Sequence, residues 1–238
     1  LPIDLNKAKK IAVIGEFAVK PRFQGGGSSH INSFKISSLM DSLKEYENVT
    51  YIKGFSADED CYEEALALEA LNAAKSADKV VICAGLPDSF ESEGYDRSHM
   101  HLPECQNRLI REITAVQPET IVVLHNGSPV EMPWLSDVKG LLEAYLGGQA
   151  VGEAIADILF GNVNPSGKLA ETIPYKLSDN PSYLFFGDGD HVTYNEGIFV
   201  GYRYYDAKEM PVAFPFGYGL SYTTFAYSNL TLDRSNIT

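Results

Sequence analysis

The chain has 238 residues, 45% of them hydrophobic, which is enough for one large domain with a full core and argues against disorder. Its formal net charge of −13 disfavours binding to nucleic acid or to an anionic membrane, because both need a basic patch. The three cysteines form no CxxC pair, so neither a disulfide framework nor a zinc site is expected.

Alternating strand-like and helix-like segments follow one another along the first two thirds of the chain. In chain order the sequence predicts a strand at 10–15, a helix at 33–46, strands and helices in turn at 49–54, 62–76, 80–84, 106–116 and 120–124, a strand at 141–145 and a helix at 149–159. Because the strands are almost continuously apolar, we expect a mostly parallel sheet with helices on both faces, a three-layer α/β sandwich. Cys83 lies in such a strand and should be a small buried hydrophobe.

The helix at 33–46 rests on the spacing of its apolar residues. They are Phe34, Ile36, Leu39, Leu43 and Tyr46.

After Asn162 the pattern changes: proline and glycine become frequent and aromatic residues cluster, which predicts an irregular segment wrapped on the sheet domain. We therefore assign residues 1–224 to one domain. Residues 225–238 alternate apolar and polar side chains and predict one strand of a further, truncated unit.

A charged loop follows the strand at 80–84 and is the first candidate site. It contains Glu91, Glu93 and Asp96, together with Gly94 and Arg97. Open α/β sheets place their chemistry at the carboxyl ends of strands. From the pattern alone, solvated charges with Asp96 paired to Arg97 explain the loop better. The alternative is that one carboxylate is a general acid with a raised pKa.

The glycine run at 25–27, followed by Ser28 and Ser29, has two interpretations. It contains no nucleotide-binding fingerprint, so it is either a surface turn that needs positive φ or the rim of a cleft whose serine hydroxyls meet a polar ligand.

The five histidines are scattered and favour structural roles over a metal site, so we expect neither metal nor cofactor. No GxSxG nucleophile motif is present.

Short motifs along nearly the whole chain, taken in order, resemble the α/β sandwich domain of glycoside hydrolase family 3, the β-glucosidase and β-xylosidase group. They lie at 11–15, 25–29, 91–97, 102–103, 147–150, 155–161, 164–169, 172–174, 194–205 and 214–222. The resemblance implies a retaining β-glycosidase, with β-glucosidase as the first expectation. In that family a TIM-like barrel carries the aspartate nucleophile and the sandwich domain lends the acid/base glutamate.

The resemblance assigns roles to the loop residues. The family's glutamate precedes the glycine of the Glu-Gly-Tyr-Asp-Arg pattern, which implies that Glu93 is the acid/base, with Glu91 as second choice. Asp96 and Arg97 would support the loop, and Ser28 or Ser29 would lie near the sugar.

The resemblance also implies partners that this sequence lacks. The substrate would be an oligosaccharide or other glycoside, and the TIM-like barrel of the same enzyme would complete the site, so the chain alone should be inactive. Residues 225–238 would open a fibronectin-III-like domain. A β-xylosidase or α-arabinofuranosidase of the same family, or a non-catalytic sugar-binding scaffold, are the alternatives, and a homo-oligomer stays open. No signal peptide is visible, so a cytoplasmic location is expected, with the start of the protein in doubt because Leu1 is not Met.

Overall fold

A computed structural model of the chain describes residues 1–94, 96–187 and 189–234. Five strands form one parallel sheet with the spatial order β2-β1-β3-β4-β5. The strands are β1 (Ile11–Ile14), β2 (Val49–Ile52), β3 (Lys79–Gly85), β4 (Thr120–His125) and β5 (Gly140–Glu143). The predicted parallel sheet is confirmed, and each predicted strand lies within two residues of an observed one at both ends.

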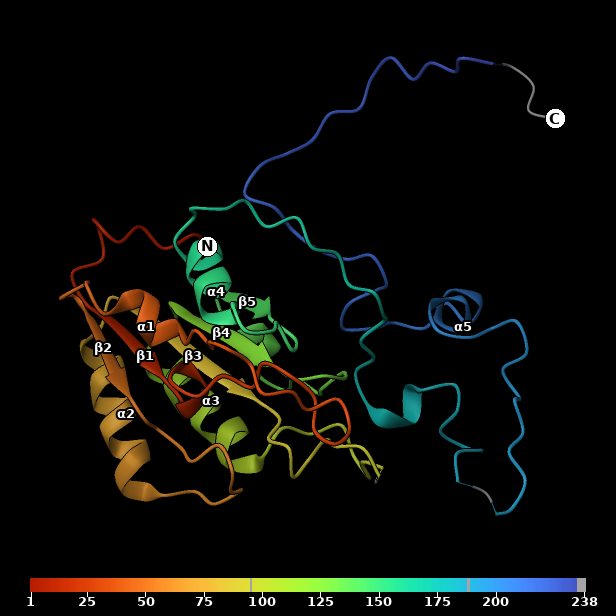
Figure 1. The fold of residues 1–238 in the computed structure, drawn as a ribbon, viewed down its shortest axis with the longest axis horizontal. Coiled ribbons are helices and arrows are strands. Elements are labelled where there is room, and N and C mark those ends of the chain that lie inside the picture. Colours follow the sequence, from red (N-terminus) through yellow and green to blue (C-terminus); the bar gives the residue numbers. More distant parts are fainter. Residues whose placement is uncertain (95, 188, 235–238) are drawn as a thin grey trace.

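Helices cover both faces of the sheet (Figure 1). The α-helices are α1 (Leu39–Leu43), α2 (Glu64–Ser76), α3 (Glu104–Val116), α4 (Val151–Leu159) and α5 (Tyr202–Ala207), and the short 3₁₀ turns are η1 (Glu16–Ala18), η2 (Leu135–Asp137) and η3 (Leu177–Asp179). Helix α1 packs on α4, and α2 packs on α3. The two pairs lie on opposite sides of the sheet, which confirms the three-layer α/β sandwich. None of the described helices combines the length and the apolarity needed to cross a membrane.

The core lies in and around the central strands. Every residue of β1 and β4 is buried, as expected for strands covered on both faces. Register pairs such as Val13 with Val81 and Ile82 with Val122 place β-branched side chains in adjacent rows across the sheet. Cys83 is fully buried among them, as predicted. This rigid sheet fixes the positions of the loops that leave its carboxyl edge.

The predicted helix at 33–46 is wrong in extent, because only Leu39–Leu43 is helical. A capping box starts the helix at Ser38: its Oγ accepts from the Asp41 N–H at 3.1 Å, and its own N–H donates to the Asp41 carboxylate at 3.0 Å. Upstream of this cap, Phe34 is fully exposed. The apolar spacing of residues 34–46 therefore does not correspond to one buried helical face.

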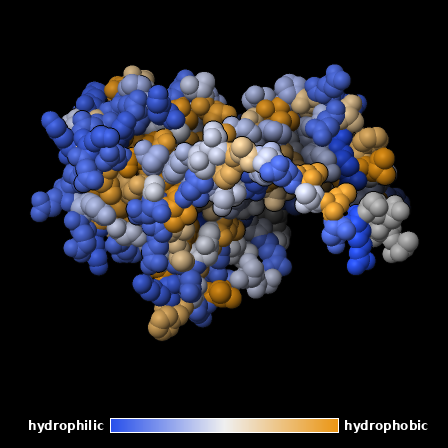
Figure 2. All heavy atoms as spheres, turned by 90° about the horizontal axis from the view of Figure 1, so that it is seen from above, coloured by the Kyte–Doolittle hydropathy of each residue, from blue (hydrophilic) through white to orange (hydrophobic). Residues whose placement is uncertain are grey.

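The chain after α4 has little regular structure, as predicted, but it leaves the sheet and forms a second lobe instead of wrapping on the sheet domain (Figure 1). An isolated bridge joins Ile173 to Phe214, and α5 is its only described α-helix. Apolar side chains such as Leu184, Tyr194 and Ile198 are exposed, and Figure 2 shows apolar side chains at the surface of this half of the molecule. Residues 225–234 form no strand, and 235–238 lie outside the described residues, so a further domain beginning there stays a prediction.

Candidate active site

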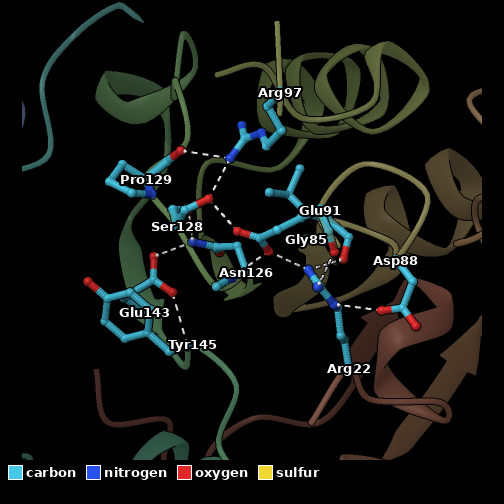
Figure 3. A network of polar contacts seen from close by, with 12 residues as sticks. Arg22, Gly85, Asp88, Glu91, Arg97, Asn126, Ser128, Pro129, Glu143 and Tyr145 are labelled. Carbon is cyan, nitrogen blue, oxygen red and sulfur yellow. Dashed lines mark hydrogen bonds and ion pairs between the residues drawn. The ribbon is translucent and has the colours of Figure 1, made fainter. Parts of the chain in front are cut away.

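The charged loop after β3 lies against the loop after β4, because these neighbouring parallel strands end at the same edge of the sheet (Figure 3). Arg22, in the segment after η1, binds the charged loop from the protein interior, and its side chain is only 5% exposed. It donates to the Leu86 carbonyl at 3.0 Å, to Asp88 at 3.0 Å and to the Glu91 carbonyl at 2.8 Å. One buried guanidinium thereby connects the end of β3 to the middle of the loop.

Glu91 is the carboxylate that this arginine binds most directly, with Arg22 Nη1 2.5 Å from Glu91 Oε2. The Gly127 N–H donates to the same oxygen at 2.8 Å, and the Ser128 hydroxyl donates to Oε1. At the far end of the loop, Arg97 Nη1 donates to Ser128 Oγ at 2.7 Å and to the Pro129 carbonyl at 3.3 Å. Glu91 is thus a structural anchor in this chain.

The suggested Asp96–Arg97 pair is not among the ion pairs of the described residues. Arg97 lies inward, against Ser128 and Pro129, while Asp96 is exposed. The loop is therefore held by contacts to the β4 loop rather than by a pair within itself. Tyr95 of the same loop lies outside the described residues.

Glu93 has the opposite environment: its side chain is exposed, and its Oε2 accepts from the backbone N–H of Ser28 at 2.6 Å. Ser28, through its hydroxyl and its N–H, holds the pKa of Glu93 below its usual value. The fold thus brings two residues chosen from the sequence, Glu93 and Ser28, into contact across 65 positions. Ser29 is exposed in the same glycine loop.

The glycine loop packs directly on the charged loop, which explains why positions 26 and 27 are glycines. A Cβ on Gly27, whose φ is +88°, would lie 2.4 Å from the Cβ of Glu93. A Cβ on Gly26 would lie 2.8 Å from Ser92 Oγ. The run therefore contains the positive-φ turn of the first interpretation and lies against the charged loop. Its role as the rim of a ligand site stays a prediction.

A second acidic cluster at this edge was not found from the sequence. Glu143, at the end of β5, accepts from the Tyr145 N–H at 3.0 Å and from the Asn126 amide at 3.3 Å, and the Tyr145 hydroxyl donates to Glu171 at 3.0 Å. Burial, reinforced by Glu171 and Glu91, raises the pKa of Glu143 to about 8. Its position at the carboxyl end of a strand was the one available signal. No sequence signal pointed to Arg22, because this residue belongs to no motif.

The histidines take local roles in the described part of the chain. His125 is buried and stacked on Phe17, and burial lowers its pKa to about 4. His99 stacks on His101, which faces Glu131 at 3.2 Å. Among the described residues, no group of three or more His, Cys, Asp or Glu side chains could hold a metal ion.

An open pocket of about 500 Å³ lies between the charged loop and the second lobe. Its walls include Arg97 and His99 from the loop side, and Glu171, Tyr202 and Phe216 from the lobe. The aromatic rings of Tyr202 and Phe216 are stacked with their centroids 4.9 Å apart. The candidate site is therefore a carboxylate-bearing loop beside a mixed polar and aromatic pocket.

The chain is similar to known proteins in sequence and in fold. The thermostable β-glucosidase B of Acetivibrio thermocellus is 55% identical over 99% of this chain, and the exo-α-(1→6)-L-arabinopyranosidase of Bifidobacterium longum is 46% identical over 95% of it. The crystal structure of the GH3 β-glucosidase of Bifidobacterium adolescentis superimposes with a TM-score of 0.90 at 48% identity, covering 95% of this chain and 33% of that one. The chain spans 32% and 30% of the length of the two curated relatives.

The sequence profile of the glycosyl hydrolase family 3 C-terminal domain matches residues 1–222. The match agrees with the family resemblance of the ordered motifs and with the observed sandwich. The chain therefore belongs to glycosyl hydrolase family 3, as its C-terminal domain.

Proposed function

We propose that this chain supplies the general acid/base of a retaining β-glycosidase, with Glu93 in that role. The observation that carries the proposal is the contrast between the loop's two glutamates. Glu91 uses both carboxylate oxygens in bonds to Arg22, Gly127 and Ser128, whereas Glu93 is exposed and accepts from the Ser28 N–H through Oε2. This exposure lets Glu93 meet a substrate from outside the chain. The nucleophile would be an aspartate of a barrel domain of the same enzyme.

The proton cycle follows from the surroundings of Glu93. Retaining enzymes hold two carboxyl groups about 5–5.5 Å apart, one as nucleophile and one as acid/base. In this chain alone, Ser28 favours the ionised form of Glu93. A second carboxylate facing Glu93 would raise its pKa and keep the proton for the leaving oxygen. Glycosylation of that carboxylate removes its charge, and Glu93 then returns to the basic form that activates water.

The proposed substrate is a terminal β-linked glucoside, by analogy with the 55% identical β-glucosidase. An α-L-arabinopyranoside is the second candidate, favoured by the relative that is 46% identical. A β-xylosidase or α-arabinofuranosidase activity, or a non-catalytic scaffold, are the remaining alternatives from the family resemblance. We place Ser28 and Ser29 at the rim of the sugar site, because Ser28 already contacts Glu93.

The test is Glu93→Gln in the full-length enzyme, assayed on glucosides with good and poor leaving groups. Loss of the proton donor should lower kcat/KM on poor leaving groups by about 10²-fold or more and spare a dinitrophenyl glucoside at the first step, because general acid catalysis contributes roughly 10²–10⁴-fold. Glu104→Gln, which removes an exposed carboxylate paired with Arg111 on α3, is the matched control. Equal activity of Glu93→Gln and the control on poor leaving groups would remove the assignment.

A further inference from the structure

The loop that carries Glu93 is fixed by the carboxylate of Glu91, which lies two residues earlier. Both oxygens of Glu91 are engaged: Oε2 with Arg22 at 2.5 Å and with the Gly127 N–H at 2.8 Å, and Oε1 with the hydroxyl of Ser128. The Glu91 side chain is 17% exposed. An ion pair with a guanidinium and two further donors is a strong and directional attachment.

The attachment reaches both ends of the loop. Arg22 also donates to the carbonyls of Leu86, at the start of the loop, and of Glu91 itself. Ser128 accepts from Arg97, at the end of the loop, while it donates to Glu91 (Figure 3). One carboxylate therefore links the segment after η1, the loop after β3 and the loop after β4.

Glu93 lies two residues from this anchor and is attached more weakly. Among the described residues, its carboxylate accepts one hydrogen bond, from the Ser28 N–H in the glycine loop. Any movement of residues 91–92 is therefore passed directly to Glu93. A misplacement of about 1 Å can cost on the order of 10²-fold in rate, because proton transfer needs a narrow geometry.

We propose that Glu91 is a positioning residue for the reaction: held by Arg22 and Ser128, it sets where Glu93 presents its carboxyl group. The inference rests on the proposed role of Glu93. Glu91 does not touch the substrate in this account, and it exchanges no proton with it. Its contribution is to keep the Glu93 carboxyl group within reach of the leaving oxygen.

The experiment compares Glu91→Gln, Glu93→Gln and the control Glu104→Gln in the full-length enzyme. Gln at position 91 keeps the side-chain shape and loses the charge that binds Arg22. We expect kcat on poor leaving groups to fall by about 10- to 100-fold, with KM within about threefold, because a displaced acid slows proton transfer rather than sugar binding. The kcat/KM on the dinitrophenyl glucoside should stay within a few-fold of the parent, since the first step with that leaving group needs no proton.

Two further readouts separate positioning from catalysis and from general instability. Glu91→Gln should keep the alkaline limb of the kcat/KM–pH profile, with its midpoint moved, because Glu93 still donates the proton; Glu93→Gln should lose that limb. Azide should accelerate Glu93→Gln and leave Glu91→Gln unchanged, because the Glu93 carboxylate still excludes the anion. The thermal midpoint of Glu93→Gln should lie close to that of the control, whereas that of Glu91→Gln should be lower, because Arg22 loses the charge of its buried partner. The kinetics are therefore compared at a temperature at which all three variants are folded.

Several results would overturn the inference. Identical kinetics for Glu91→Gln and Glu104→Gln would show that the anchor does not position the acid. Azide acceleration of Glu91→Gln would make Glu91 itself the acid/base and would overturn the assignment of Glu93 as well. Unchanged activity of Glu93→Gln on poor leaving groups removes the proposed function separately, whatever Glu91→Gln does.

Ser128→Ala is the milder second variant for the case in which Glu91→Gln does not fold. It removes one donor to Glu91 and the acceptor of Arg97 while leaving the Arg22 pair intact. We expect Ser128→Ala to lower kcat by a few-fold, less than Glu91→Gln does, and only on poor leaving groups. No change on poor leaving groups in Ser128→Ala would then count against the inference.

Discussion

Three glutamates near the carboxyl edge of the sheet differ in what surrounds them. Glu91 is anchored by Arg22, Glu93 is exposed, and Glu143 is enclosed with Tyr145 and Asn126. The motif pattern singled out Glu93 and left Glu91 as second choice. The anchoring of Glu91 is visible only in three dimensions, because it depends on Arg22, which lies 69 positions away from Glu91 in the sequence.

Glu143 gives a prediction about pH and stability. Its pKa is raised from 4.5 to about 8, so the folded protein keeps a proton that the unfolded chain releases at lower pH. Its contribution to stability is therefore complete below about pH 4.5 and is lost as the pH rises towards 8, up to about 5 kcal/mol in total. In Glu143→Gln this loss is absent, so the Tm of the variant relative to the parent should increase between pH 5 and 8.

The measurement is thermal unfolding of the full-length enzyme at a series of pH values. Glu69→Gln, an exposed position on α2, serves as the control and should follow the parent at every pH. Parallel Tm–pH curves for Glu143→Gln and the parent would show that Glu143 is ionised in the folded protein throughout.

At the scale of elements, strands were predicted well and loops were not. The strand signals are local, since short β-branched runs identify β1, β3 and β4 directly. The helix at 33–46 failed because apolar spacing alone does not reveal the cap at Ser38. The contact of the glycine loop with the charged loop depends on the strand order β2-β1-β3-β4-β5, which no local pattern contains.

Gly27→Ala tests that loop contact. Its φ of +88° and the 2.4 Å approach of a Cβ to Glu93 mean that the glycine loop or Glu93 must move. We expect backbone strain of roughly 1–3 kcal/mol and a loss of about tenfold or more on poor leaving groups. The readouts are kcat/KM and Tm of the full-length enzyme.

Gly197→Ala is the matched control for this substitution. Gly197 also has positive φ, at +56°, but a Cβ there meets nothing within 4 Å. It should show strain without the loss of activity. Wild-type kinetics in Gly27→Ala would mean that the two loops do not constrain each other.

At the scale of the molecule, the chain corresponds to one part of its longer relatives. It spans about a third of the length of its curated relatives, and the lobe after α4 exposes side chains such as Phe186, Tyr194 and Leu220. The ordered motifs identified the family from the sequence. The sequence could not show what completes the site, because the proposed nucleophile is not among these residues.

The purified 238-residue chain should therefore show no hydrolysis of an aryl β-glucoside above background. It contains the proposed acid/base, whereas the proposed nucleophile belongs to a barrel domain of the full-length enzyme. The assay needs a preparation whose circular dichroism shows the folded sandwich, with the full-length enzyme as positive control. Cleavage by the folded fragment would mean that the chain holds a complete active site.

The central claim is that Glu93 is the acid/base, and product analysis tests it most directly. Full-length Glu93→Gln is incubated with dinitrophenyl β-glucoside and azide, and the product is identified by NMR. If Glu93 is the acid/base, the product is β-glucosyl azide, because loss of the carboxylate charge lets azide attack the glycosyl-enzyme on the face that Glu93 serves. Glucose as the sole product, released at the parent rate, would contradict it.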